Sequence, residues 1–214
     1  MKIATIVGAR PQFVKAAVLS RLISQHSDME EIMIHTGQHY DDNMSAIFFE
    51  ELAIPQPRYN LNIHQLTHGA MTGRMMEEIE KVLLLETPDW VIVYGDTNST
   101  LAGALAAKKL HIPVAHVEAG LRSYNMAMPE EINRILTDRI SDLLFCPTQQ
   151  AVDNLKKEGF DHFKNTIVLS GDVMLDAILY NADKWQKPAV KLPEKYLLCT
   201  VHRAENVNDT LQLK

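Results

Sequence analysis

Short apolar runs alternate along the chain with longer segments whose apolar positions recur at helical spacing. The predicted strands cover residues 2–7, 31–36, 90–94, 114–117, 143–146 and 166–169. The first predicted helix begins at Pro11. Further helices are predicted over residues 43–52, 67–85, 97–110, 130–141, 149–157 and 173–185. Strands that alternate in this way with helices predict a parallel sheet covered on both faces, which is an α/β doubly wound fold.

Two of these helices carry a regular apolar stripe that should face the sheet. In the helix that begins at Pro11, the stripe is formed by Val14, Val18 and Leu22. In the helix over residues 130–141, it is formed by Ile132, Leu136 and Ile140.

The pattern changes after residue 185. Residues 186–195 contain Pro188, Pro193 and several charges, which is typical of a linker, and residues 196–201 then form a new apolar strand. We therefore expect an N-terminal domain over residues 1–185, a linker over 186–195 and, over 196–214, the start of a truncated second domain. The alternative is a terminal strand that joins the sheet of the first domain.

The composition of the chain argues against some classes of function. The 214 residues carry 21 Lys and Arg against 27 Asp and Glu, a net charge of −6, so a nucleic-acid partner is not indicated. No apolar run reaches the roughly 18 residues of a membrane span. Cys146 and Cys199 each end an apolar run, and we expect both to be buried and reduced in a cytoplasmic protein.

The first predicted turn has the residues of an anion site. Gly8-Ala9-Arg10-Pro11 joins a strand to a helix, and Lys15 follows about one helical turn later. The sequence is not Gly-x-Gly-x-x-Gly, so a nicotinamide dinucleotide is not supported. Backbone N–H groups at a helix start favour an anion, and Arg10 and Lys15 would add charge for a phosphate. The alternative is two solvated surface cations.

Carboxylates follow two strands and open one helix in the stretch from residue 90 to residue 138. Asp96 follows the strand over 90–94, Glu118 follows the strand over 114–117, and Glu130 starts a helix. The carboxyl ends of parallel strands line the ligand crevice of an open α/β sheet, so these groups should meet around one substrate.

Each carboxylate also has a purely structural interpretation. Asp96 would serve as a helix N-cap, although Thr97 can do the same. Glu118 would form a local ion pair with Arg122. Glu130 would complement the helix dipole and pair with Arg134 four residues on.

Other chemistries lack their motifs. The chain has neither a Walker A sequence nor a Gly-x-Ser-x-Gly elbow. His64 and His68 have i, i+4 spacing but no third ligand beside them, which argues against zinc. His202 follows an apolar strand and is either a ligand contact or a loop histidine. Local cations and several carboxylates thus indicate an enzyme that acts on a phosphorylated or nucleotide-linked substrate.

A set of ordered motifs along the whole chain resembles the non-hydrolysing UDP-N-acetylglucosamine 2-epimerases. The motifs are Gly8-Ala9-Arg10-Pro11 with Lys15, Thr36-Gly37-Gln38-His39, Gly95-Asp96-Thr97, residues 116–122 (HVEAGLR), residues 129–134 (PEEINR), Ser170-Gly171-Asp172 and residues 202–206 (HRAEN). The resemblance implies two Rossmann-like domains in the glycosyltransferase-B arrangement, of which this chain would be the N-terminal half. It also implies a cytoplasmic homodimer that supplies surface polysaccharide synthesis, with no metal or other cofactor.

The resemblance further implies a reaction and residue roles. UDP-GlcNAc and UDP-ManNAc would interconvert by elimination and re-addition of UDP through a 2-acetamidoglucal. Arg10, Lys15 and His202 would stabilise the leaving diphosphate. Asp96, Glu118 and Glu130 would move the proton at C2, and Arg134 would hold Glu130.

Some residues depart from the family pattern. Gln38-His39-Tyr40-Asp41 and Thr67-His68 replace the runs that hold an activating second UDP-GlcNAc in several members. The tracts over residues 95–107 and 123–138 are more similar to a subgroup that acts on UDP-2,3-diacetamido-2,3-dideoxyglucuronate. Further alternatives are hydrolytic release of ManNAc, a glycosyltransferase, and a non-catalytic nucleotide-sugar binding protein. The 214 residues alone are expected to be inactive.

Overall fold

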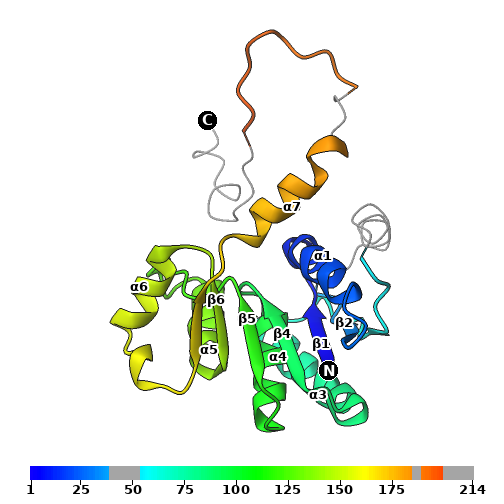
Figure 1. The fold of residues 1–214 in the computed structure, drawn as a ribbon, viewed down its shortest axis with the longest axis vertical. Helices are drawn as coiled ribbons and strands as arrows, with labels where there is room; N and C mark the ends of the chain where they lie inside the picture. Colours follow the sequence, from blue (N-terminus) through cyan, green and yellow to red (C-terminus); the bar gives the residue numbers. More distant parts are fainter. Residues whose placement is uncertain (39–53, 185–188, 200–214) are drawn as a thin grey trace. The chain divides into compact units, whose positions relative to one another are not determined.

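The computed structural model describes residues 1–38, 54–184 and 189–199. In this part of the chain, one sheet of seven parallel strands has the order β3-β2-β1-β4-β5-β6-β7 (Figure 1). The strands are Lys2–Val7 (β1), Glu30–His35 (β2), Tyr59–Asn60 (β3), Trp90–Tyr94 (β4), Val114–Val117 (β5), Leu143–Cys146 (β6) and Thr166–Leu169 (β7). The order reverses between β1 and β4, which is the switch point of a doubly wound sheet, so the predicted fold is confirmed.

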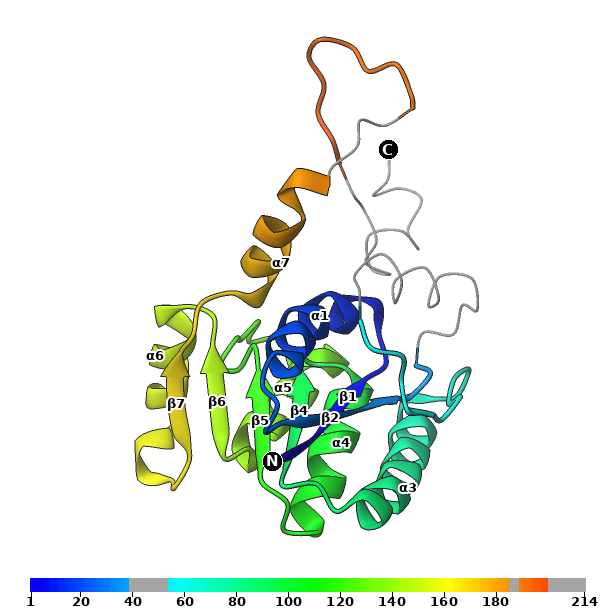
Figure 2. The same ribbon diagram turned by 45° about the vertical axis from the view of Figure 1, so that its right-hand side comes forward.

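Helices cover both faces of the sheet (Figure 2). They are Arg10–Ser24 (α1), His68–Glu86 (α3), Asn98–Lys109 (α4), Pro129–Ile140 (α5), Gln149–Lys157 (α6) and Val173–Asn181 (α7), with 3-10 turns at Phe160–His162 (η1) and Ala182–Lys184 (η2). Successive strand residues point to opposite faces. Ile3 and Val7 accordingly pack with α1 and α7, whereas Ala4 and Ile6 pack with α3 and α4.

The apolar stripe predicted for the first helix is only partly correct, because Val18 packs against the core but Leu22 does not. Leu22 is 54% exposed, and the apolar residues that α1 buries are Phe13, Ala16, Ala17 and Ile23. The small side chains of Ala16 and Ala17 let the helix lie close to the sheet. With this side of the helix facing the sheet, Gln12 and Lys15 are buried as well.

The stripe predicted for the helix over residues 130–141 is also only partly correct, because Ile140 packs against the core but the other two residues do not. Ile132 and Leu136 are 40% and 46% exposed, whereas α5 buries Glu131, Asn133, Thr137 and Asp138. Periodicity shows that a helix has two faces, but the side that faces inward depends on what lies beneath. Here the turns after β4 and β5 offer polar partners, so the polar face is buried.

The chain divides into two compact units, Met1–Asn181 and Ala182–Lys214. The predicted strand over 196–201 is absent over the described residues 196–199, where Leu197 is 99% exposed and no described segment supplies the pairing that a strand needs. Cys199 is exposed, so its predicted burial is wrong, while Cys146 is buried as predicted. The predicted helix over 43–52 lies outside the described residues, and none of the described helices has the length and apolar character to cross a membrane.

Gly8 lies where there is no room for a side chain. A Cβ atom added there would overlap the buried hydroxyls of Thr36 and Ser99, which are 2.8 Å apart. Gly8→Ala is therefore expected to lower the free energy of unfolding by about 1–3 kcal/mol in urea denaturation. The control is Gly73→Ala on the exposed side of α3, where nothing lies within 4 Å and a gain of about 0.5–1 kcal/mol is expected. Wild-type stability of Gly8→Ala would contradict this packing.

Candidate active site

The site forms where β4 and β5 end. These strands are neighbours, with Tyr94 paired to Val117, so the turns that follow them emerge side by side. The Gly95 N–H donates to the Val117 carbonyl at 3.0 Å. A Cβ atom added to Gly95 would lie 3.2 Å from Glu118 Oε2 and 3.4 Å from Lys15 Nζ. Lys15 and Glu118 therefore lie directly beside the Gly95–Asp96 turn.

Lys15 from α1 forms an ion pair with Glu118 at the end of β5. The two side chains are only 9% and 23% exposed, so this pair is poorly screened by water. Two of the predicted site residues thus meet, although the sequence separates them by 103 positions. The alternative pair between Glu118 and Arg122 is wrong, because Arg122 bonds Asp138 and Glu158 instead.

Arg134 from α5 forms an ion pair with Asp96. Its other terminal nitrogen lies 3.0 Å from a Glu131 carboxylate oxygen. The expected contact with Glu130 is wrong: the side chain of Glu130 is exposed and makes no hydrogen bond or ion pair within the described part of the chain. The side chain of Arg134 points away from Glu130 because it forms ion pairs with the carboxylates of Asp96 and Glu131.

Asp96 is not needed to cap α4. Thr97 is the N-cap, and its hydroxyl accepts from the Thr100 N–H at 3.3 Å. The side chain of Asp96 is 32% exposed and bonds Arg134, so it remains available for chemistry at the sheet edge.

Sequence reasoning missed Gln12, which holds the first turn. Its side-chain oxygen accepts from the N–H groups of Gly8 at 2.8 Å and Ala9 at 2.9 Å, and its amide nitrogen donates to the Tyr94 carbonyl at 2.8 Å. The predicted anion site at this turn therefore needs correction, since Gln12 already occupies those two N–H groups. Glutamine at the third position of a helix is one half of the capping-box signal, and Ala9 at the N-cap lacks the hydroxyl of the other half. Arg10 at the same turn is exposed.

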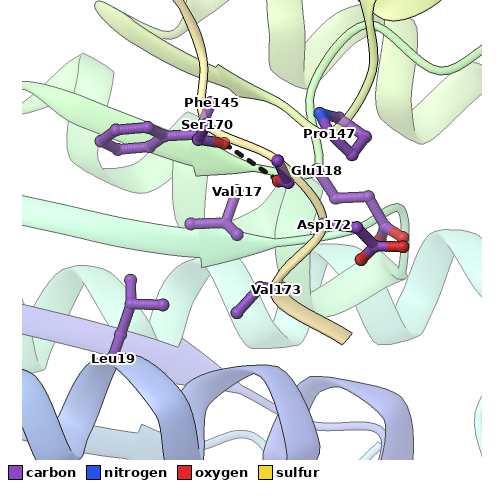
Figure 3. A pocket seen from close by; sticks show the side chains of 9 residues that line it. Leu19, Val117, Glu118, Phe145, Pro147, Ser170, Asp172 and Val173 are labelled. Carbon is purple, nitrogen blue, oxygen red and sulfur yellow. Dashed lines mark hydrogen bonds between the residues drawn. The ribbon is translucent and has the colours of Figure 1, made fainter. Parts of the chain in front are cut away.

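A cavity of about 230 Å³ adjoins Glu118 (Figure 3). Its walls are mostly apolar, and in Figure 3 the carboxylates of Glu118 and Asp172 lie toward the same end. The lining residues are Leu19, Val117, Glu118, Phe145, Pro147, Ser170, Gly171, Asp172 and Val173. The cavity therefore links Glu118 at the end of β5 to the Ser170-Gly171-Asp172 motif. Within the described residues, no three His, Cys, Asp or Glu side chains are grouped to hold a metal, and His202 lies outside those residues.

The neighbouring residues Glu130 and Glu131 have opposite surroundings. Glu131 is fully buried and accepts from the N–H groups of Ser123 and Tyr124 at 2.8 to 3.1 Å. Burial alone would raise the pKa of Glu131, but these N–H groups and Arg134 outweigh burial and lower its pKa. Glu131 therefore fastens the loop over residues 121–128 to α5, and Glu130 is left at the surface.

Glu131→Gln is expected to lower the free energy of unfolding at pH 7 by about 1.5–3 kcal/mol, because an amide cannot replace the charged acceptor. A lowered pKa in the folded state stabilises the protein fully above the ordinary value of 4.5 and progressively less as the pH falls through the folded-state pKa. The difference between wild type and variant should therefore shrink below pH 4.5. Urea titrations over this pH range measure it, with Glu130→Gln as a control of unchanged stability. Equal effects of the two variants would refute the assignment.

Comparison with known proteins places this geometry in a family. Residues 21–214 match the family model described as UDP-N-acetylglucosamine 2-epimerase. The chain is 60% identical over 214 residues to the UDP-2,3-diacetamido-2,3-dideoxy-D-glucuronate 2-epimerase of Pseudomonas aeruginosa and 50% identical over 222 residues to the UDP-N-acetylglucosamine 2-epimerase of Methanocaldococcus jannaschii. A crystal structure of the latter enzyme with UDP-GlcNAc and UDP superposes with a TM-score of 0.90. In all three matches the whole chain aligns with 60% of the other protein. The chain belongs to the UDP-N-acetylglucosamine 2-epimerase family.

Proposed function

We propose that the whole protein containing these residues is a UDP-sugar 2-epimerase that interconverts UDP-GlcNAc and UDP-ManNAc. The observation that carries this proposal is the pairing of two carboxylates with two cations at one edge of the sheet, Glu118 with Lys15 and Asp96 with Arg134. Cations are needed where a diphosphate leaves, and carboxylates are needed where a proton moves. Family membership supplies the substrate class.

The reaction follows from the chemistry of the sugar. C2 has no adjacent carbonyl, so its proton is too weakly acidic for direct removal. Breaking the bond between C1 and the diphosphate oxygen releases UDP, and loss of the C2 proton then forms the double bond of a 2-acetamidoglucal. UDP re-adds at C1 while C2 accepts a proton on the opposite face. Atoms and charge balance without an external oxidant or reductant.

The proposed residue roles follow the contacts. Lys15 and Arg134, with the exposed Arg10 at the first turn, would bind the diphosphate and stabilise it as a leaving group. Asp96 and Glu118 would exchange protons with C2 because they lie on adjacent turns. Arg134 orients Asp96 through their ion pair, which replaces the predicted support of Glu130.

Glu130 and His202 complete the proposed set. Glu130 lies at the exposed start of α5, on the same helix as Arg134, and would join the proton transfer once a substrate is bound. His202 would stabilise the diphosphate from the segment that follows the linker. A second Rossmann-like domain, a cytoplasmic homodimer and a place in surface polysaccharide synthesis belong to the same proposal for the whole protein.

A second substrate is supported by a specific comparison. The relative that is 60% identical to this chain is named for UDP-2,3-diacetamido-2,3-dideoxy-D-glucuronate, and the one that is 50% identical is named for UDP-GlcNAc. The same elimination and re-addition would apply, because the C1 and C2 substituents involved in the reaction are alike. The diacetamido-uronate is therefore the second candidate.

Proton NMR in D2O tests the function. The whole protein is incubated separately with UDP-GlcNAc and with the diacetamido-uronate sugar nucleotide. We expect the H2 signal to disappear and a manno-configured anomeric signal to appear, because C2 is reprotonated from solvent. Exchange with the uronate alone would replace the first candidate by the second. Free ManNAc would indicate hydrolysis, and UDP binding without exchange in either sugar would indicate a non-catalytic protein.

A further inference from the structure

His116 is a fully buried residue of β5 whose two ring nitrogens both make short polar contacts. Nε2 lies 2.7 Å from the Gly95 carbonyl oxygen, which can only accept, so Nε2 donates. Nδ1 lies 2.7 Å from Asp138 Oδ1. The ring therefore connects the turn before α4 to the interior face of α5.

Asp138 anchors the other side of this link. Its Oδ2 accepts from Arg122 Nη1 at 2.7 Å and from the Gly120 N–H at 3.1 Å. Burial alone would lower the pKa of the Arg122 guanidinium, but Glu158 and Asp138 outweigh burial and raise its pKa, so Arg122 stays charged. Gly120 and Arg122 belong to the turn that follows Glu118. A single buried chain of contacts thus runs from the turn of Asp96 to the turn of Glu118.

Neighbouring contacts fix the same two turns. The Asn133 amide donates to the Asp96 carbonyl oxygen at 2.9 Å, so two successive carbonyls, those of Gly95 and Asp96, are held by side chains. Glu118 has φ of 75°, in the left-handed region that costs a residue other than glycine energy. Such a conformation persists only where the surroundings impose it, and Glu118 is followed by the turn that Asp138 holds.

We propose that His116 is a positioning residue of the epimerase reaction: by holding the Gly95 carbonyl it sets the place of Asp96 relative to Glu118. This inference rests on the proposed function. His116 has no exposed surface, so it acts through these turns and not by touching the substrate. Proton transfer at C2 depends on small displacements of the carboxylates, because misplacement by about 1 Å can cost about 10²-fold in rate.

Two substitutions of His116 distinguish its contact with the Gly95 carbonyl from its contact with Asp138. A glutamine amide reaches approximately the place of Nε2 and keeps a donor for Gly95, whereas an asparagine amide reaches only the place of Nδ1 and keeps the contact with Asp138. His116→Asn therefore removes the proposed positioning bond, and His116→Gln preserves it. Thr137→Val is the matched control, because Thr137 is a buried neighbour of Asp138 whose hydroxyl has no hydrogen-bond partner in the described part of the chain.

The kinetic readout is the share of turnovers that end in free 2-acetamidoglucal and UDP, measured together with kcat and KM. A loss of folded protein lowers kcat but leaves this share unchanged, whereas a misplaced carboxylate fails to return the proton and raises it. We expect His116→Asn to lower kcat by about 10²-fold with KM little changed and to release more glycal. His116→Gln and Thr137→Val should keep the wild-type share. An unchanged share in His116→Asn, or equal losses in the Asn and Gln variants, would overturn the proposal.

Hydrogen exchange gives a readout that does not need turnover. Amides of residues 95–98 should exchange faster in His116→Asn than in wild type, and His116→Gln should retain protection. Equal exchange in all three proteins would overturn the proposal even if the wild type proved inactive toward every UDP-sugar. Inactivity of the wild type alone would instead refute the proposed function, so the two failures are distinguishable.

Discussion

The parallel pairing of β4 with β5 is the constraint on which the site depends. It places the turn that contains Asp96 beside the turn that contains Glu118, and both turns open at the carboxyl edge of the sheet. α1 then brings Lys15 to Glu118, and α5 brings Arg134 to Asp96. Asp96 and Glu118 therefore each have a cation from a helix that lies far from them in the sequence. A slip of this register would separate all four groups.

The same edge explains why α5 buries its polar face. Burying charged or polar groups without partners is costly, and the buried side chains of Glu131, Asn133 and Asp138 on this helix each have a partner in one of the two turns or in the loop that follows them. Asn133 holds the Asp96 carbonyl, Asp138 holds His116 and the Gly120 N–H, and Glu131 holds the loop over residues 121–128. The helix thus supplies hydrogen bonds that hold the two turns and the loop in place, and Ile132 and Leu136 remain at the surface.

The sequence alone was sufficient for the fold and for the expectation that Asp96 and Glu118 lie on adjacent turns at one edge of the sheet. Alternating strands and helices determine a doubly wound sheet, and a carboxylate after a strand must lie at the carboxyl edge. The partners of those carboxylates were not predictable by local spacing, because spacing favoured Arg122 for Glu118 and Glu130 for Arg134. Lys15 was predicted as a phosphate ligand without its contact to Glu118, since nothing local relates residues from α1 and β5.

Residues that act from inside the fold were also missed. Asp138 lies outside the recognised motifs, His116 opens the motif over residues 116–122 without a role assigned to it, and Gln12 has only half of a capping box. Their contacts depend on which turns lie beside them. The inward sides of α1 and α5 were assigned only in part, with Val18 and Ile140 correct, for a related reason. Apolar periodicity does not reveal that Ala16 and Ala17 allow α1 to approach the sheet closely. It also does not reveal that the polar side chains of α5 find hydrogen-bond partners in the turns beneath that helix.

The most direct test of the account is positional isotope exchange in a UDP-sugar labelled with oxygen-18 between C1 and the β-phosphorus. If Lys15 and Arg134 receive UDP as a leaving group, cleavage makes the oxygens of the β-phosphate equivalent. The label should then move to non-bridging positions while the epimer forms, and phosphorus NMR detects that movement. Formation of the epimer with all of the label still in the bridge would show that the oxygens of the β-phosphate never become equivalent, which would contradict release and re-addition of UDP at this edge.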